Sequence, residues 1–241
     1  ELKTTTNSKE YSDLWIPFLR SFAAHQKEKG WFDRTVIAMD ERALDAMQDA
    51  YRIAQEAAPG IKMSLAGNYH KELVDKIYDY CIAWKQQFTP EDLALRNSKG
   101  WISTSYTACP DAMPNVGSNN EPIEATYLPL YCLANGFNGF LRWAWMNWTD
   151  NPMHDSRFKL FTPGDTYIVY PGMHSSRRFE HIIRGVQNVA KIETLRKEYN
   201  QKKNQKALQL LEDALSQFRN PTPNEAELKV SIDKIESLLN K

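Results

Sequence analysis

Two spacings of apolar residues alternate along the chain and predict its elements. Between Ser8 and Lys29, large apolar residues recur at three- and four-residue steps, which is typical of a helix with one apolar face. We expect Pro17 to mark the start of this helix or a bend in it, and Gly30 to end it. Four apolar or β-branched positions beginning at Thr35 then predict a strand that ends in two acids. A helix is expected over 42–58.

The same alternation of strand and helix continues through the middle of the chain. Further strands are predicted at 61–66, 77–83, 101–107 and 140–146, and helices at 89–98 and 123–135. Thr89-Pro90 is a clear helix start, with Thr as the cap and Pro at the first helical position. Five strands alternating with helices predict an α/β fold with a parallel sheet, as a barrel wall or a doubly wound sheet.

The last third of the chain has a different character. A loop over 147–174 is too rich in aromatic residues for disorder. A long amphipathic helix follows over 175–197, and two charged helices are expected over 203–218 and 225–239. We interpret them as a C-terminal helical hairpin, which divides the chain into a domain of residues 1–198 and a hairpin of residues 199–241.

Composition excludes several classes of function. The 241 residues are 42% hydrophobic and 25% charged with a formal net charge of zero, so neither nucleic acid nor an anionic membrane surface is an expected partner. No apolar run is long enough to span a bilayer, and no signal peptide opens the chain, whose start at Glu1 resembles the interior of a longer protein. The three cysteines and five histidines lack metal-ligand spacing, so we expect no metal and no cofactor.

The most distinctive chemistry is the adjacent pair Asp40 and Glu41 at the end of the first predicted strand. In (β/α) units, catalytic side chains lie at the carboxyl ends of strands. Neighbouring residues on a strand point in opposite directions, so the two acids are expected to serve two neighbouring groups of one ligand. Mutual repulsion raises the pKa of one such acid, which suits a general acid. The alternative is two acids favouring the positive end of a helix.

Other polar and aromatic residues near predicted strand ends are candidates for binding a sugar. Trp143 and Trp145 share a face of the fifth predicted strand by its two-residue period, and aromatic walls beside acids suit pyranose rings. Tyr106 ends the fourth strand, and Asn68 and Asp165 lie in loops. Each has an ordinary structural alternative: a core aromatic, a satisfied buried tyrosine, a turn residue or a loop cap.

An ordered set of short motifs resembles the catalytic domain of glycoside hydrolase family 123. The motifs are Met39-Asp40-Glu41-Arg42, Gly67-Asn68-Tyr69-His70, Tyr106-Thr107-Ala108-Cys109, Arg142-Trp143-Ala144-Trp145, the segment from Gly164 to Gly172, and Ser175-Ser176-Arg177-Arg178-Phe179-Glu180. The resemblance covers roughly residues 10 to 198. It implies a retaining β-N-acetylgalactosaminidase on a (β/α)8 TIM barrel, from a bacterial periplasmic or extracellular setting. Such enzymes use the 2-acetamido group of the substrate as the nucleophile.

The resemblance also assigns roles to residues of this chain. Glu41 would be the general acid/base, and Asp40 would orient the 2-acetamido group and stabilise an oxazolinium intermediate. Tyr106 would bond the acetamido oxygen, and Trp143 and Trp145 would line the sugar pocket. With Asn68 and Asp165, these residues form the expected substrate-binding set, and neither a metal nor a cofactor is implied.

The chain departs from this family pattern in its number of strands. A complete barrel needs eight strands, and the sequence predicts about five, with the acid pair at the end of the fourth strand in the order of the family. We therefore expect strands 4–8 here, with the first three supplied by the same gene or by another chain. Two alternatives stay open: a non-catalytic carbohydrate-binding or scaffold fragment, and a glycosidase with a covalent nucleophile such as Asp155 or Asp165.

Overall fold

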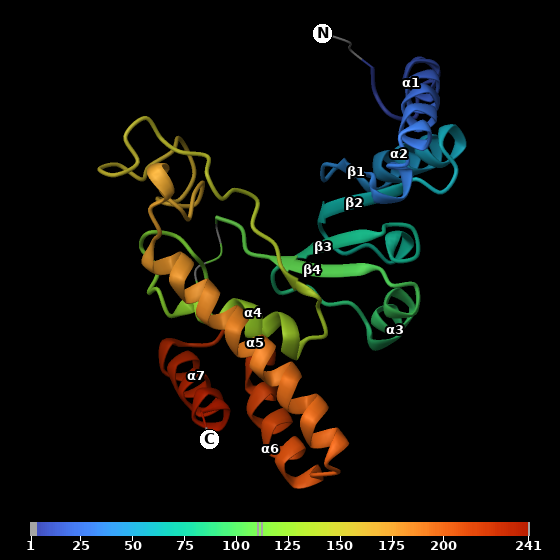
Figure 1. Cartoon of the computed structure of the whole chain (residues 1–241). Helices are drawn as coiled ribbons and strands as arrows, with labels where there is room; N and C mark the ends of the chain where they lie inside the picture. The colour runs from blue at the N-terminus through green and yellow to red at the C-terminus, as the bar shows by residue number, and fades with distance from the viewer. Residues whose placement is uncertain (1–3, 110, 112, 241) are drawn as a thin grey trace. The chain divides into compact units, whose positions relative to one another are not determined.

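The computed structural model describes residues 4–109, 111 and 113–240. The chain forms two compact units that divide between Ser103 and Thr104 (Figure 1). Both are built from parallel strands and helices, as the sequence predicts.

The first unit holds three parallel strands with a helix after each of the first and third. Strand β1 pairs with β2 with Val36 opposite Lys62, and β2 pairs with β3 with Ser64 opposite Asp79. The predicted positions of these strands and helices are therefore confirmed to within a few residues. The elements are α1 (Lys9–Glu28), β1 (Val36–Met39), α2 (Leu44–Ala57), β2 (Lys62–Gly67), β3 (Asp79–Ala83) and α3 (Pro90–Ser98), with 3-10 turns at Phe32–Arg34 and Lys71–Leu73.

Helix α1 runs without a break through Pro17, so the expected start near this residue is wrong. Ser8 caps the helix by accepting a hydrogen bond from the backbone N–H of Tyr11. The rings of Tyr11 and Trp15 lie 5.9 Å apart, and those of Trp15 and Phe18 lie 5.7 Å apart. These contacts between successive turns span the proline and stabilise the turn that precedes it.

A buried arginine ties the polypeptide of the first unit together. The side chain of Arg96, on α3, is fully buried and donates to the carbonyls of Val74 at 2.9 Å and Ile77 at 2.7 Å. It also donates to Ser103 Oγ at 2.7 Å and to two further carbonyls. Burial lowers the pKa of its guanidinium to about 10. The guanidinium thus joins the carbonyls of Val74 and Ile77, which precede β3, to helix α3.

Strand β4 (Ile102–Tyr106) crosses the division, and the second unit continues through α4 (Glu124–Ala134) and β5 (Gly139–Phe140). The sheet has five strands in the order β1-β2-β3-β4-β5, which is the order of the chain. The remaining helices are α5 (Arg177–Gln201), α6 (Gln205–Ser216) and α7 (Glu225–Leu239), with 3-10 turns at Pro171–Met173 and Gln217–Arg219. The predicted α/β class with parallel strands is therefore confirmed.

The predicted extent of the fifth strand, 140–146, is wrong, because the observed strand is much shorter. Strand β5 ends at Phe140, and the following segment bonds to the long loop instead of the sheet. The N–H of Ile168 donates to the carbonyl of Trp145 at 3.0 Å, and Met146 forms an antiparallel bridge with Tyr167. Alternating aromatic and apolar residues thus continue past the point where the chain leaves the sheet.

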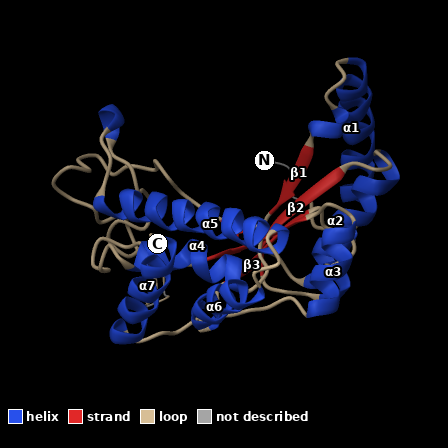
Figure 2. Ribbon diagram, turned by 60° about the horizontal axis from the view of Figure 1, so that its bottom comes forward, coloured by secondary structure: helices blue, strands red, loops and turns tan. Residues whose placement is uncertain are grey.

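The C-terminal helices pack on α4 and α5, and the two predicted charged helices are confirmed (Figure 2). Arg184 of α5 donates to the carboxylate of Glu236 on α7 at 2.7 Å. Arg196 of α5 donates to Glu212 on α6 at 2.6 Å. Helix α5 thus anchors both helices of the hairpin. Among the described residues, no helix combines the length and apolar character that crossing a membrane requires.

Candidate functional site

The acid pair lies between β1 and α2, in a short segment without regular structure. Strand β1 ends at Met39, and α2 begins at Leu44 with Ala43 as its cap residue and no side-chain cap bond. Neither acid therefore caps the helix. Asp40 Oδ1 accepts the N–H of Glu41 at 2.9 Å, and Arg42 forms an ion pair with Oδ2 at 2.5 Å. The side chain of Asp40 is 73% exposed and open to a ligand.

The carboxylate of Glu41 turns toward the end of the neighbouring strand β2. Its Oε1 accepts the backbone N–H of Asn68 at 3.1 Å and a second hydrogen bond from the Asn68 side-chain amide. Gly67 allows this approach, since a Cβ there would lie 3.0–3.1 Å from Glu41 Cβ, Cγ and Cδ. Asn68, predicted as a substrate contact, is thus bonded directly to the predicted general acid/base.

Gln86, which the sequence analysis missed, fixes the orientation of the Asn68 amide. Gln86 Nε2 donates to Asn68 Oδ1 at 2.6 Å, so the amide NH₂ of Asn68 faces Glu41. The N–H of Tyr69 donates to Gln86 Oε1 at 2.5 Å. Gln86 follows β3, so extending the strand-end rule to a third strand would have identified it.

The buried phenol of Tyr80 also holds the loop that bears Asn68. Tyr80 Oη donates to the carbonyl of Asn68 at 2.6 Å and accepts the N–H of His70 at 2.8 Å. Burial raises the pKa of Tyr80 to about 12, so the phenol keeps its proton in the physiological range. The loop that bears Asn68 is therefore fixed by both a side-chain amide and a phenol.

Asp40 and Glu41 have different surroundings in the first unit. A groove of about 580 Å³ is lined by Asp40 and Arg42 together with apolar residues of α1, β1 and α2, among them Trp15, Ile37 and Met47. Glu41 is absent from this lining and faces Asn68. The carboxylates of Asp40 and Glu41 thus face different neighbours, and their service to two groups of one ligand stays a prediction.

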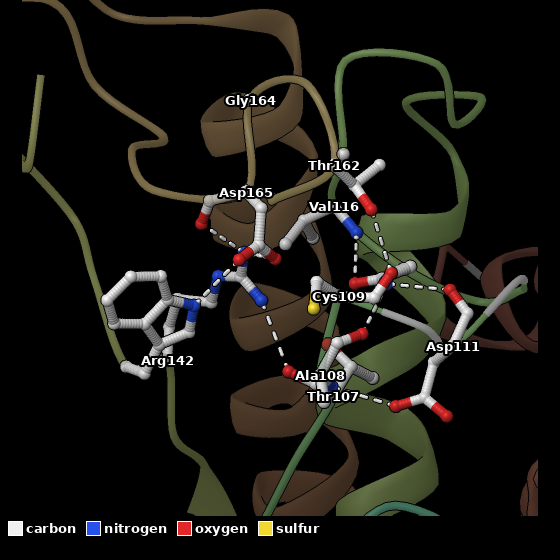
Figure 3. A network of polar contacts seen from close by, with 12 residues as sticks. Thr107, Ala108, Cys109, Asp111, Val116, Arg142, Thr162, Gly164 and Asp165 are labelled. Atoms are coloured by element: carbon white, nitrogen blue, oxygen red, sulfur yellow. Dashed lines mark hydrogen bonds and ion pairs between the residues drawn. The ribbon is translucent and has the colours of Figure 1, made fainter. Parts of the chain in front are cut away.

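In the second unit, Asp165 belongs to a buried ion pair with Arg142. Arg142 and Asp165 have side chains that are 0% and 2% exposed and lie 2.5 Å apart (Figure 3). Arg142 also donates to the carbonyl of Thr107, just past the end of β4 and next to Tyr106. Burial, and then the negative charge of Asp165, raise the pKa of the Cys109 thiol. Asp165 is therefore a buried residue of the loop, and the sequence did not identify Arg142 as its partner.

The two tryptophans have different surroundings, so the prediction that they share a strand face is wrong. Trp143 donates from Nε1 to Asp165 Oδ2 at 2.9 Å, and its ring lies 5.1 Å from that of Phe161. Trp145 packs edge-on against Phe179 of α5 at 5.9 Å. Trp145 also lines an apolar groove of about 370 Å³ between α4, β5 and α5. The early end of β5 explains the difference, because strand alternation stops there.

Asp155, the other acid weighed as a nucleophile, pairs with its neighbour Arg157. The guanidinium lies 2.8 Å and 2.9 Å from its two oxygens, and these bonds lower the pKa of Asp155 to about 2. Within the described part of the chain, no three histidine, cysteine or acidic residues form a group that suits a metal ion.

Comparison with known proteins identifies the class to which this arrangement belongs. The family model described as "Glycoside hydrolase 123, catalytic domain" matches residues 1–195. The chain therefore belongs to glycoside hydrolase family 123.

A solved structure gives the same result. A family 123 glycoside hydrolase from Clostridium perfringens, studied for the details of glycolipid glycan hydrolysis, superposes with a TM-score of 0.84 at 26% sequence identity. The match covers 99% of this chain and 46% of that chain, so this chain spans about half the length of its structural relative. A search of the curated proteins found no match.

Proposed function

We propose that this domain carries out retaining, substrate-assisted cleavage of β-linked N-acetylhexosamine, with N-acetylgalactosamine preferred. Glu41 donates a proton to the glycosidic oxygen while the acetamido oxygen of the sugar attacks C1 and the leaving group departs. The resulting oxazolinium ion carries its positive charge near Asp40. Glu41, now a carboxylate, then takes a proton from a water that attacks C1, which restores the acetamido group and retains the configuration.

The observation that carries this proposal is the setting of the acid pair. Both acids follow strand β1, neither caps α2, and Glu41 is bonded to Asn68 from the end of the next strand. A fixed carboxyl group is what a proton donor needs, since its position relative to the leaving oxygen sets the rate. Asp40 keeps unused lone pairs beside Arg42, and an acetamido N–H is a suitable donor for them.

The remaining roles in the proposal are binding roles. Tyr106 bonds the acetamido oxygen, and Trp143 stacks its exposed indole on the apolar face of the sugar. Trp145, which is only half-buried, lines the pocket next to it. Asn68 acts mainly by holding Glu41, and no step needs a metal or a cofactor.

Replacement of Glu41 tests the proposal directly. We expect Glu41→Gln to lower kcat on an aryl N-acetyl-β-galactosaminide by about 10²- to 10⁴-fold, the usual contribution of a general acid/base. Glu56→Gln is the matched control, because Glu56 lies half-exposed on α2 and forms an ion pair with Arg52, away from Glu41 in the sequence. Full activity of the Glu41 variant contradicts the proposal.

Inhibition and stereochemistry separate the proposed mechanism from its alternatives. A thiazoline that mimics the oxazolinium ion is expected to inhibit, and proton NMR is expected to show the β-anomer as the first product. A covalent intermediate trapped on an aspartate instead supports the nucleophile alternative. Tight binding of the thiazoline without turnover by the natural full-length protein supports a non-catalytic carbohydrate-binding module.

The proposal includes the rest of a (β/α)8 barrel. Strand β1 pairs on one side with β2 and has no second partner strand among the described residues. Large apolar side chains beside it are partly exposed: Leu14, Trp15, Phe18 and Val36. An unpaired strand edge beside exposed apolar surface is unfavourable in water. We therefore expect three further strand–helix units, from the same gene or another chain, to cover this edge.

A direct comparison tests the barrel. The chain with such a partner segment is expected to bind a dye for exposed apolar surface less than the chain alone, and to melt higher. Equal dye binding and equal melting temperature contradict this part of the proposal. We also propose a periplasmic or extracellular location, to be tested by fractionation of the source cells.

A further inference from the structure

The indole of Trp143 is exposed, yet its nitrogen is bonded to a buried acid. The residue is 45% exposed, whereas Asp165, which accepts from Nε1 at 2.9 Å, is 2% exposed. An exposed indole ordinarily bonds to water and changes rotamer freely. Here a charge-assisted hydrogen bond holds the ring from its inner edge, although the residue is 45% exposed. Phe161 packs beside the ring and limits its rotation further.

Both oxygens of Asp165 already have partners. Oδ2 accepts from Trp143, and Oδ1 lies 2.5 Å from Nη2 of Arg142. The same guanidinium donates to the backbone carbonyl of Asp165 and, at 3.2 Å, to that of Thr107 (Figure 3). Arg142 thus connects Asp165 to the end of β4, a part of the sheet with fixed backbone. The carboxylate of Asp165 therefore links the indole of Trp143, through Arg142, to the backbone at the end of β4.

The backbone on the other side of Asp165 is fixed as well. The buried side chain of Arg178, on α5, donates to the carbonyls of Gly164 at 2.7 Å and Val116 at 2.6 Å. Gly164 has φ +74°, and a Cβ there would lie 2.1 Å from Ser118 Oγ. Two buried arginines thus hold the chain immediately before and at Asp165. This explains how an acid in a 28-residue loop keeps one position.

We propose that Asp165 is a positioning residue of the sugar site, which acts through Trp143 and does not touch the substrate. This inference rests on the proposed function, because Trp143 supplies the surface on which the apolar face of an N-acetylhexosamine stacks. Asp165 fixes the rotamer of that surface before the sugar arrives. The site then loses less conformational entropy when it binds the ring.

A double-mutant cycle separates this role from direct contact. The probe is the thiazoline derived from N-acetylgalactosamine, and the dissociation constant is measured by calorimetry on the natural full-length protein. Asp165→Asn is expected to weaken binding about tenfold when Trp143 is present, because it replaces a charge-assisted bond with a weaker one. In the Trp143→Phe background, which lacks the indole donor, the same change is expected to alter binding less than twofold. An equal loss in both backgrounds overturns the proposal.

Exchange of the indole protons with solvent supplies a readout that needs no sugar. In protein labelled with ¹⁵N at tryptophan, the signal of Trp143 is assigned by its loss in Trp143→Phe. We expect its Nε1 proton to exchange at least tenfold more slowly than that of Trp31, which is also exposed, at 47%. Asp165→Asn should accelerate the exchange, whereas Asp213→Asn on α6 should not. Equal rates for Trp143 and Trp31 in the wild-type protein overturn the proposal even if the Asp165 variant does not fold.

The two measurements also distinguish this inference from the proposed function. If the wild-type protein does not bind the thiazoline, the proposed function fails, and the exchange rates still decide whether Asp165 holds the indole. If the thiazoline binds and the cycle shows no coupling, the proposed function stands and the positioning role of Asp165 is refuted.

Discussion

Adding one methyl group at Gly67 should displace Glu41 and reveal how strictly its position matters. Gly67 ends strand β2 and lies against the side chain of Glu41. In Gly67→Ala, the new Cβ would lie 3.0 Å from Cγ and 3.1 Å from Cβ and Cδ of Glu41. Ordinary contacts between carbon atoms are about 3.5–4.0 Å. The carboxyl group must therefore move by about 0.5–1 Å, which also disturbs its bonds to Asn68.

The size of this displacement sets the expected loss of activity. A misplacement of about 1 Å costs about 10²-fold in rate, which equals about 2.7 kcal/mol in activation free energy. We expect kcat to fall about 10- to 100-fold, with a smaller change in KM. The free energy of unfolding should change little. The backbone of Gly67 is outside the left-handed region, so alanine fits it without backbone strain. Alanine also reduces the conformational entropy of the unfolded chain, which stabilises the folded state by about 0.4–1 kcal/mol and offsets part of the cost of the new contact.

The assay is hydrolysis of an aryl N-acetyl-β-galactosaminide, combined with thermal unfolding of the same preparations. Gly139→Ala in strand β5 is the matched control, because the new Cβ would lie 4.0 Å from Thr104 Cγ2, an ordinary contact distance. Both variants should melt within a few degrees of the wild type, and only Gly67→Ala should lose kcat. Unchanged kcat in a folded Gly67 variant refutes the reasoning, since Glu41 would then tolerate displacement.

Three further predictions concern stability. Arg96→Met should lower the free energy of unfolding of the chain by about 3–5 kcal/mol in urea, because several buried carbonyls lose their donor; a loss below 1 kcal/mol contradicts the bonding of Arg96. Burial acts to raise the pKa of Asp92, but bonds from Lys71, Tyr69 and the backbone of Thr89 lower it more, so the folded value lies below the ordinary 3.8. The associated stability is present above that value and is lost as pH falls through the folded pKa. Asp92→Asn should flatten the dependence of the urea midpoint on pH below about 3.8, and an unchanged slope contradicts this. Gly164→Ala should lower the melting temperature more than Gly100→Ala, because both glycines have positive φ but only at Gly164 does the new Cβ meet other atoms; equal losses refute the close contact.

Much of the fold follows from local patterns in the sequence. The Thr89-Pro90 start of α3 and the limits of α7 are predicted correctly, because a capping residue or an amphipathic period fixes each. Strand β5 is overestimated because the signal for a strand is the same whether the partner is a sheet or a loop. Helix α1 passes through Pro17 because ring contacts between its turns outweigh the local preference of proline.

The candidate site is likewise predictable from the sequence only in part. Asp40 and Glu41 are recognisable from sequence because they are acids at the end of a strand. Their supporting partners are not, since Gln86 lies 18 residues from Asn68, and Arg142 lies 23 residues from Asp165. Nothing in the local sequence indicates that an amide or a guanidinium has a specific partner so far along the chain. Such partners depend on strand order and register, which single-sequence patterns do not determine.

The parallel order of the first three strands explains why Glu41 is held as it is. Strands β1, β2 and β3 are neighbours in chain order, so their carboxyl ends lie at one edge of the sheet. Glu41 follows the first, Asn68 the second and Gln86 the third, and each bonds to the next. The position of the proposed proton donor therefore depends on a residue two strands away that has no direct bond to it. A row of amides across the parallel edge thus holds the carboxyl group of Glu41 through hydrogen bonds, while the guanidinium of Arg42 pairs with Asp40.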